Sequence, residues 1–148
     1  MVATGYYLTQ ILNGFVLGVI FVLIALGLSL IFGLLGVINF AHGDLLLLGT
    51  YVAWTVMSAT NSMLLAVLLA PVVVAAVGVV IERFTLRPIY DREPTLQFLL
   101  TFGLAEVLRE GIQIVWGRQS KSFPIPAWGA GSVDFGLFSY PRYRLILI

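Results

Sequence analysis

The sequence of 148 residues contains no cysteine, and only 10% of its residues are charged, against about a quarter in an ordinary soluble domain. The lack of cysteine excludes disulfides, zinc–cysteine sites and thiol nucleophiles. A net charge of +1 gives no long-range field that would attract nucleic acid. A soluble domain needs enough charged and polar side chains to cover its surface. A chain that is 60% hydrophobic and has so few charges does not supply them. The composition therefore predicts an integral membrane protein whose surroundings are lipid.

Motifs for catalysis are also missing. No G-x-x-x-x-G-K-[ST] stretch is present, so ATP binding by a phosphate-binding loop of this kind is excluded. The single histidine, His42, cannot build a Ser-His-Asp triad at any spacing found here. A metal site made of Asn39, His42 and Asp44 would have hard oxygen ligands and one imidazole, which is weak evidence. We therefore expect no enzyme activity, no metal and no cofactor.

Charge is distributed in a way that separates long apolar segments. Residues 1–43 and 45–81 contain no Asp, Glu, Lys or Arg, and Asp44 stands alone between them. One membrane-spanning helix needs about 20 apolar residues. The sequence predicts an all-α, polytopic transmembrane bundle, a single region over 1–148, with Pro71 kinking the third helix. The four predicted spans are about 7–35, 45–59, 63–81 and 95–116, joined by a polar turn at 60–62 and a polar loop at 82–94.

The last part of the chain changes character. Residues 117–141 interleave prolines and glycines with aromatic side chains, which favour membrane interfaces. We predict an extramembrane segment here, with an amphipathic or hairpin element at the interface. Residues 142–148 look like the start of an incomplete fifth span.

Small residues follow one face of the first predicted span. They are Gly14, Gly18, Ala25, Ser29 and Gly33, spaced so that they lie in register along the helix. Close approach at small residues joins helices in lipid, so this face predicts a helix-packing surface. The alternative is that glycine is simply common in membrane helices.

The stretch from Asn39 to Asp44 interrupts the apolar sequence. In a purely structural interpretation Asn39 caps a helix, His42 donates to a backbone carbonyl, and Gly43 permits the turn. In the other interpretation the turn lines a solute path or a subunit contact, because irregular backbone at membrane depth is tolerated only against protein or water. The two are compatible.

Three charged residues occupy the second half of the fourth predicted span. Glu106, Arg109 and Glu110 share one helical face. Either the helix leaves the bilayer near Leu108, or Glu106 and Arg109 form an intramembrane ion pair, or the face acts in transport directly.

Orientation follows from the basic residues. The 82–94 loop holds three arginines, whereas four Lys and Arg residues lie in the long stretch 118–144. Short loops weigh more in the positive-inside rule, so the 82–94 loop is expected in the cytoplasm and the N-terminus outside.

Several short stretches resemble the branched-chain amino-acid ABC transporter permeases. GLSLIFG at 27–33, INFAHGD at 38–44 and LGTY at 48–51 resemble the signature around that family's first span. ERF at 82–84 with RP at 87–88 resembles its loop after span three, and TFGL at 101–104 with WG at 116–117 its fourth span. The resemblance covers nearly the whole chain, which looks like the N-terminal half of permeases about twice as long, and so truncated.

The resemblance implies a permease subunit of a binding-protein-dependent importer in the cytoplasmic membrane of a bacterium or archaeon. Its implied partners are a second permease, two ATPase subunits and an extracytoplasmic solute-binding protein. The implied solutes are leucine, isoleucine and valine, with a permease for urea or short amides as the alternative within the superfamily. A stand-alone channel or carrier would predict acidic residues within spans one to three, which are absent.

Overall fold

A computed structural model describes residues 2–125, 127–136 and 138–145. It is mostly helical, as predicted, and divides into two compact units. One unit combines residues 1–27 with 125–148, and the other holds residues 28–124.

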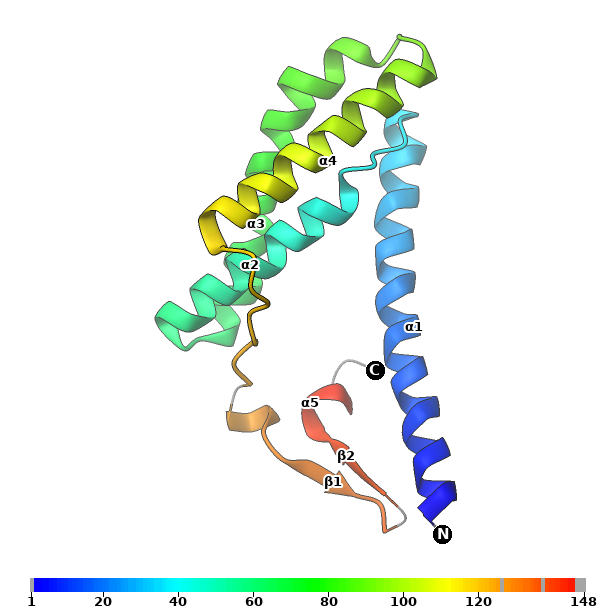
Figure 1. Cartoon of the computed structure of the whole chain (residues 1–148), viewed down its shortest axis with the longest axis vertical. Coiled ribbons are helices and arrows are strands. Elements are labelled where there is room, and N and C mark those ends of the chain that lie inside the picture. Colours follow the sequence, from blue (N-terminus) through cyan, green and yellow to red (C-terminus); the bar gives the residue numbers. More distant parts are fainter. Residues whose placement is uncertain (1, 126, 137, 146–148) are drawn as a thin grey trace. The chain divides into compact units, whose positions relative to one another are not determined.

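The first helix, α1, runs from Val2 to Leu35 (Figure 1). Its end is set by Gly36, whose backbone lies in the left-handed region at φ 67°. The Gly36 N–H donates to the Phe32 carbonyl at 2.8 Å. Glycine adopts this conformation without a Cβ clash and so stops a helix while satisfying one of its last carbonyls.

Helices α2 (His42–Thr60) and α3 (Met63–Ile81) form a tight helical hairpin. Asn61 takes a left-handed conformation (φ 52°) and its N–H donates to the Met57 carbonyl at 2.8 Å. The Ser62 hydroxyl then accepts the Leu65 N–H at 3.4 Å, which caps α3. The predicted polar turn is confirmed, and α3 runs through Pro71.

The predicted polar loop at 82–94 is wrong over its first part, because the helix continues. A π-helical turn (Glu82–Leu86) and a 3₁₀ turn (Arg87–Ile89) follow α3 directly. The Glu82 carboxylate accepts the Arg87 Nε–H at 3.1 Å and the Tyr90 hydroxyl at 3.0 Å, so the charges are paired on helical backbone. Burial first, and then the bond to Glu82, raises the pKa of Tyr90 above its ordinary value of 10.0.

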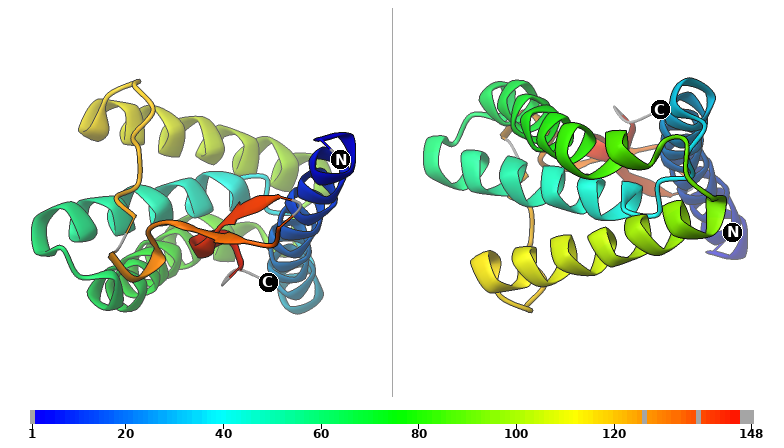
Figure 2. Two further views of the ribbon diagram at one scale, coloured as in Figure 1. Left: turned by 90° about the horizontal axis from the view of Figure 1, so that it is seen from below. Right: turned by 90° about the horizontal axis from the view of Figure 1, so that it is seen from above.

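Helix α4 (Pro94–Trp116) begins with proline in its first turn and ends at Gly117, φ 81°. Helix α2 lies between α3 and α4, as the right view of Figure 2 shows. Gly49 of α2 allows close approach to α3, because a Cβ at that position would lie 3.3 Å from Cγ2 of Val74. On α3, Ala66 and Ala70 are buried.

Within the described residues, two helical stretches are long and apolar enough to cross a membrane: Thr4–Leu35 and Met63–Ile89. Helix α2 carries Asp44, and α4 carries three charged side chains. The four helices coincide closely with the predicted spans, but crossing by α2 and α4 stays a prediction.

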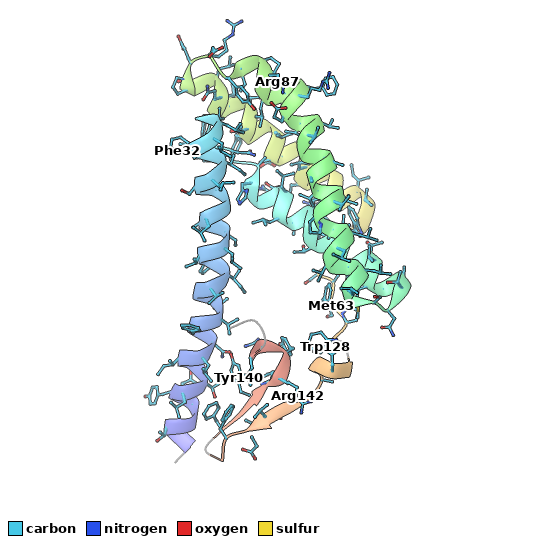
Figure 3. All side chains as sticks on the ribbon, turned by 180° about the vertical axis from the view of Figure 1, so that it is seen from behind. Phe32, Met63, Arg87, Trp128, Tyr140 and Arg142 are labelled. Carbon is cyan, nitrogen blue, oxygen red and sulfur yellow. The ribbon has the colours of Figure 1, made fainter. Side chains whose placement is uncertain are left out.

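The other unit pairs the first part of α1 with a small hairpin. Strands β1 (Ser132–Asp134) and β2 (Ser139–Pro141) are antiparallel, with Val133 opposite Tyr140. Tyr140, labelled in Figure 3, is fully buried and donates to Asn13 Oδ1 at 3.0 Å. Of the predicted fifth span, α5 covers Arg142–Leu145, and residues 146–148 lie outside the described residues.

Candidate functional site

The connection between α1 and α2 is irregular backbone in which alternate residues are buried. Val37, Asn39 and Ala41 are 1%, 5% and 0% exposed. Asn39 Oδ1 accepts the Ala41 N–H at 3.0 Å, and the Asn39 carbonyl accepts the His42 N–H at 3.1 Å. Such an Asx turn satisfies backbone donors just ahead of a helix. Asn39 therefore organises the start of α2.

Gly43 and His42 do not have the roles that the structural interpretation of this stretch predicted. Gly43 lies inside α2, and the left-handed glycine of the connection is Gly36. His42 Nε2 is buried, and no hydrogen-bond partner for it is found in the described part of the chain. The expected bond from this nitrogen to a carbonyl is therefore not seen, which leaves one polar atom of the turn open to a further partner.

The turn is fixed onto α4 by one hydrogen bond and one aromatic contact. Thr101, fully buried on α4, donates its hydroxyl to the Ile38 carbonyl at 3.3 Å, and the same oxygen lies 2.9 Å from the Gln97 carbonyl. The rings of Phe40 and Phe98 meet edge to face, with centroids 4.8 Å apart. One side of this irregular segment is thus held against α4.

An ion-pair cluster joins α2 to α4 one turn further along. Arg109 Nε and Nη2 donate to the two Asp44 carboxylate oxygens at 3.2 and 3.3 Å, and Arg109 Nη1 donates to Glu106 at 2.9 Å. The Asp44 side chain is 9% exposed, whereas those of Arg109 and Glu106 are 46% and 48% exposed. Planar, two-pronged pairing of this kind gives geometric specificity. We name Asp44, Arg109 and Glu106 the α2–α4 cluster.

Glu106 and Arg109 form an ion pair at 2.9 Å. Its location within the membrane stays a prediction, and the partnership with Asp44 was not foreseen. Sixty-five positions separate Asp44 from Arg109, so no local spacing indicates it. The available signal was that a lone acidic residue in a long uncharged run needs a counter-charge. Glu110 lies apart from the cluster and is 3.8 Å from Arg118 at an exposed position.

Within its own unit, the part of the predicted small-residue face of α1 at Gly14 and Gly18 meets no neighbour. A Cβ added at Gly14, Gly18 or Gly33 meets no atom within 4 Å, and Ala25 and Ser29 are exposed. Its role in packing stays a prediction. The small residues that do pack are those between α2 and α3, which sequence reasoning missed although Ala66 and Ala70 are spaced like a small-xxx-small pair.

Among the described residues, no group of three or more His, Asp or Glu side chains is placed to hold a metal ion. Both oxygens of Asp44 already bind Arg109. The cluster therefore offers fixed hydrogen-bonding groups and charge rather than a catalytic constellation.

The chain is similar to known transport proteins. Residues 10–148 match the family model described as "Branched-chain amino acid transport system / permease component". The permease protein BraD of a high-affinity branched-chain amino acid transport system in Pseudomonas aeruginosa is 30% identical over 140 residues, which is 88% of this chain and 45% of that protein. The corresponding LivH proteins of Salmonella typhimurium and Escherichia coli K12 are each 30% identical over 128 residues, covering 80% of this chain and 42% of theirs.

The chain thus spans less than half the length of these curated relatives. No solved structure gives a significant match. Because the family model covers all but the first few residues, the chain belongs to the family of branched-chain amino acid transport system permease components.

Proposed function

We propose that this chain is part of the transmembrane permease subunit of a binding-protein-dependent ABC importer for branched-chain amino acids. The observation that carries the proposal is the family match over residues 10–148. The relatives are named permease proteins of high-affinity branched-chain amino acid transport systems, and the apolar helices suit a membrane location.

Within that subunit, the turn of Asn39, His42 and Asp44 lines the solute path or a contact with another subunit. Two features support this role. The turn is irregular backbone held against α4, and His42 Nε2 is buried without a partner among the described residues. Arg109 holds α2 in register with α4 through Asp44, which makes it a positioning residue rather than a carrier of solute.

The proposed assembly follows from the family. The permease pairs with a second permease, two ATPase subunits hydrolyse ATP in the cytoplasm, and an extracytoplasmic solute-binding protein delivers the amino acid. The chain is multi-pass in a bacterial or archaeal cytoplasmic membrane, with α1 to α4 all crossing. The turn around Asp91 then faces the cytoplasm and residues 117–141 face outside.

The test is uptake by the assembled system. The gene with its neighbouring ATPase, permease and binding-protein genes is expressed in a host that lacks its own leucine importers, and uptake of labelled leucine is measured with and without a Walker-lysine substitution in the ATPase. We expect ATP-dependent leucine uptake that isoleucine and valine inhibit. ATP-dependent uptake of urea, with none of leucine, would favour the urea or amide alternative.

A second arm addresses the stand-alone alternative. The purified chain in vesicles, without any ATPase, is expected to give no saturable uptake of leucine or urea. Saturable uptake would mean a self-sufficient channel or carrier.

A further inference from the structure

A cavity separate from the α2–α4 cluster lies between α2 and the segment after α4. Its volume is about 360 Å³, within the range of roughly 300–1,000 Å³ of small-molecule sites. Leu47, Thr50, Tyr51 and Trp54 line it from α2, and Ser120, Lys121 and Phe123 line it from the following segment.

The walls of the cavity are fixed by hydrogen bonds and ring contacts. The Trp54 indole N–H donates to the Ser122 carbonyl at 3.1 Å, which ties the segment to α2. The Trp116 indole N–H donates to Thr55 Oγ1 at 2.8 Å, and the Trp116 ring lies 5.4 Å from that of Tyr51. A pocket with anchored walls is largely formed before a ligand arrives, which lowers the cost of ordering it on binding.

Charge in the lining is of one sign. Lys121 is its single charged residue, and its ammonium lies 5.4 Å from the centre of the Trp54 ring. No carboxylate lines the cavity, and no ion pair of Lys121 is found among the residues described. The remaining lining is aromatic or aliphatic apart from the hydroxyls of Thr50, Tyr51 and Ser120. Such a pocket complements a small molecule with one anionic end and an apolar body.

We infer that this cavity binds an aliphatic amino acid, with its carboxylate on Lys121 and its branched side chain against Leu47 and Phe123. The inference rests on the proposed function, in whose topology this end of α2 and α4 faces outside, where solute arrives. The hydroxyl oxygens of Thr50 and Ser120 offer acceptors to the ammonium of the amino acid. The cavity then acts as an entry site ahead of the α2–α4 cluster.

The test is direct binding to the full chain in nanodiscs of phosphatidylcholine, which carries no net charge. Labelled L-leucine is bound and then displaced by one of two analogues. 4-Methylpentanoate keeps the carboxylate and the branched tail but lacks the ammonium, and 3-methylbutylamine keeps the ammonium and lacks the carboxylate. We expect 4-methylpentanoate to displace leucine and the amine to fail at tenfold higher concentration.

Three variants locate the site. Lys121→Gln is expected to weaken leucine binding at least tenfold, and Lys121→Arg to restore it within about threefold. Arg118→Gln is the matched control, because it removes the same charge three residues away at a position outside the lining, and it should bind like the parent chain. Equal elution on size exclusion and equal far-ultraviolet circular dichroism establish that Lys121→Gln is folded.

Three results would each overturn the site. Leucine binding could be unchanged in Lys121→Gln, or 3-methylbutylamine could displace leucine as strongly as 4-methylpentanoate does. The third such result is that the chain does not bind leucine at all. Loss of binding in nanodiscs containing phosphatidylglycerol, with excess leucine unable to restore it, would also overturn it, since a lipid phosphate would then be the true occupant. If the assembled system imports leucine while the chain shows no Lys121-dependent binding, the site fails and the proposed function stands. If Lys121-dependent binding is found but no leucine is imported, the proposed function fails and a carboxylate site remains.

Discussion

The two partners of the Asp44–Arg109 pair differ in burial, and the difference predicts unequal effects of removing each. Arg109→Gln leaves a carboxylate that is 9% exposed without its counter-charge, whereas Asp44→Asn leaves a guanidinium that is 46% exposed and still bound to Glu106. A buried charge left without its counter-charge is costly. We expect Arg109→Gln to lower the free energy of unfolding more than Asp44→Asn does.

The measurement is unfolding in mixed micelles titrated with dodecyl sulfate. The double variant, Asp44→Asn with Arg109→Gln, should recover part of the loss, since the unpaired carboxylate is gone. Equal losses for the two single variants with no recovery in the double would mean that the pair is exposed to water in the membrane.

A single amide closes the turn between α3 and α4. Gln97 Nε2 lies within hydrogen-bond distance of the carbonyls of Ile89, Tyr90 and Arg92, at 3.1, 3.0 and 3.1 Å, and its two N–H groups are shared among these three acceptors. Losing these bonds costs about 1–2 kcal/mol by the usual worth of a hydrogen bond. We expect Gln97→Leu to increase the rate of trypsin cleavage after Arg92 about tenfold.

The matched control for this variant is Gln113→Leu on the same helix, whose side chain makes no hydrogen bond within the described residues. Cleavage after Arg92 should be unchanged in it. If both variants are cleaved like the parent chain, the amide does not hold the turn.

At the scale of helices, the α2–α3 contact depends on the absence of a side chain at Gly49. A Cβ there would stand 3.3 Å from Val74, and a larger side chain would force the helices apart at about 1–3 kcal/mol. We expect Gly49→Leu to lower the thermal midpoint in micelles, and Gly78→Leu on α3, where nothing lies within 4 Å among the described atoms, to leave it nearly unchanged. Equal midpoints for both would show that the contact tolerates bulk.

The small-residue face of α1 predicts a different phenotype, because it is expected to pack on another helix of the assembly. Within its own unit a Cβ at Gly18 meets no atom within 4 Å, so Gly18→Leu should leave that unit as stable as before and reduce the yield of the assembled transporter. Val19→Leu, about 100° around the helix, should alter neither. Pull-down of the partner subunits on a tagged chain measures the yield, and equal yields for the two variants would mean that the face is not an interface.

Helix positions could be predicted well because uncharged runs, Pro94 and the polar turn at Asn61 are local signals. The continuation of the helix after α3 through Ile89 could not be predicted, because the charges in this segment suggested a loop, whereas Glu82 pairs with Arg87 on helical backbone. The α2–α4 cluster was predicted in part. Its Glu106–Arg109 half is set by helical spacing, and its Asp44 half depends on tertiary packing that brings together residues 65 positions apart.

For the whole molecule, the testable property is topology. The chain contains no cysteine, so single cysteines at Asp91 and Ser122 report sidedness directly. Because the arginines around Asp91 favour the cytoplasm, we expect an impermeant maleimide added to intact cells to label Ser122→Cys and to spare Asp91→Cys until the cells are opened. The reverse pattern would invert the proposed orientation.

The Asp44–Arg109 pair also has a consequence for biosynthesis. Asp44 leaves the ribosome 65 residues ahead of Arg109, a delay of roughly 3–13 s at a synthesis rate of about 5–20 residues per second. During that interval Asp44, in the first turn of α2, has no counter-charge among residues 1–81, which hold no other charged side chain. In the proposed topology we therefore expect this end of α2 to stay at the water-facing boundary of the membrane until α4 supplies Arg109.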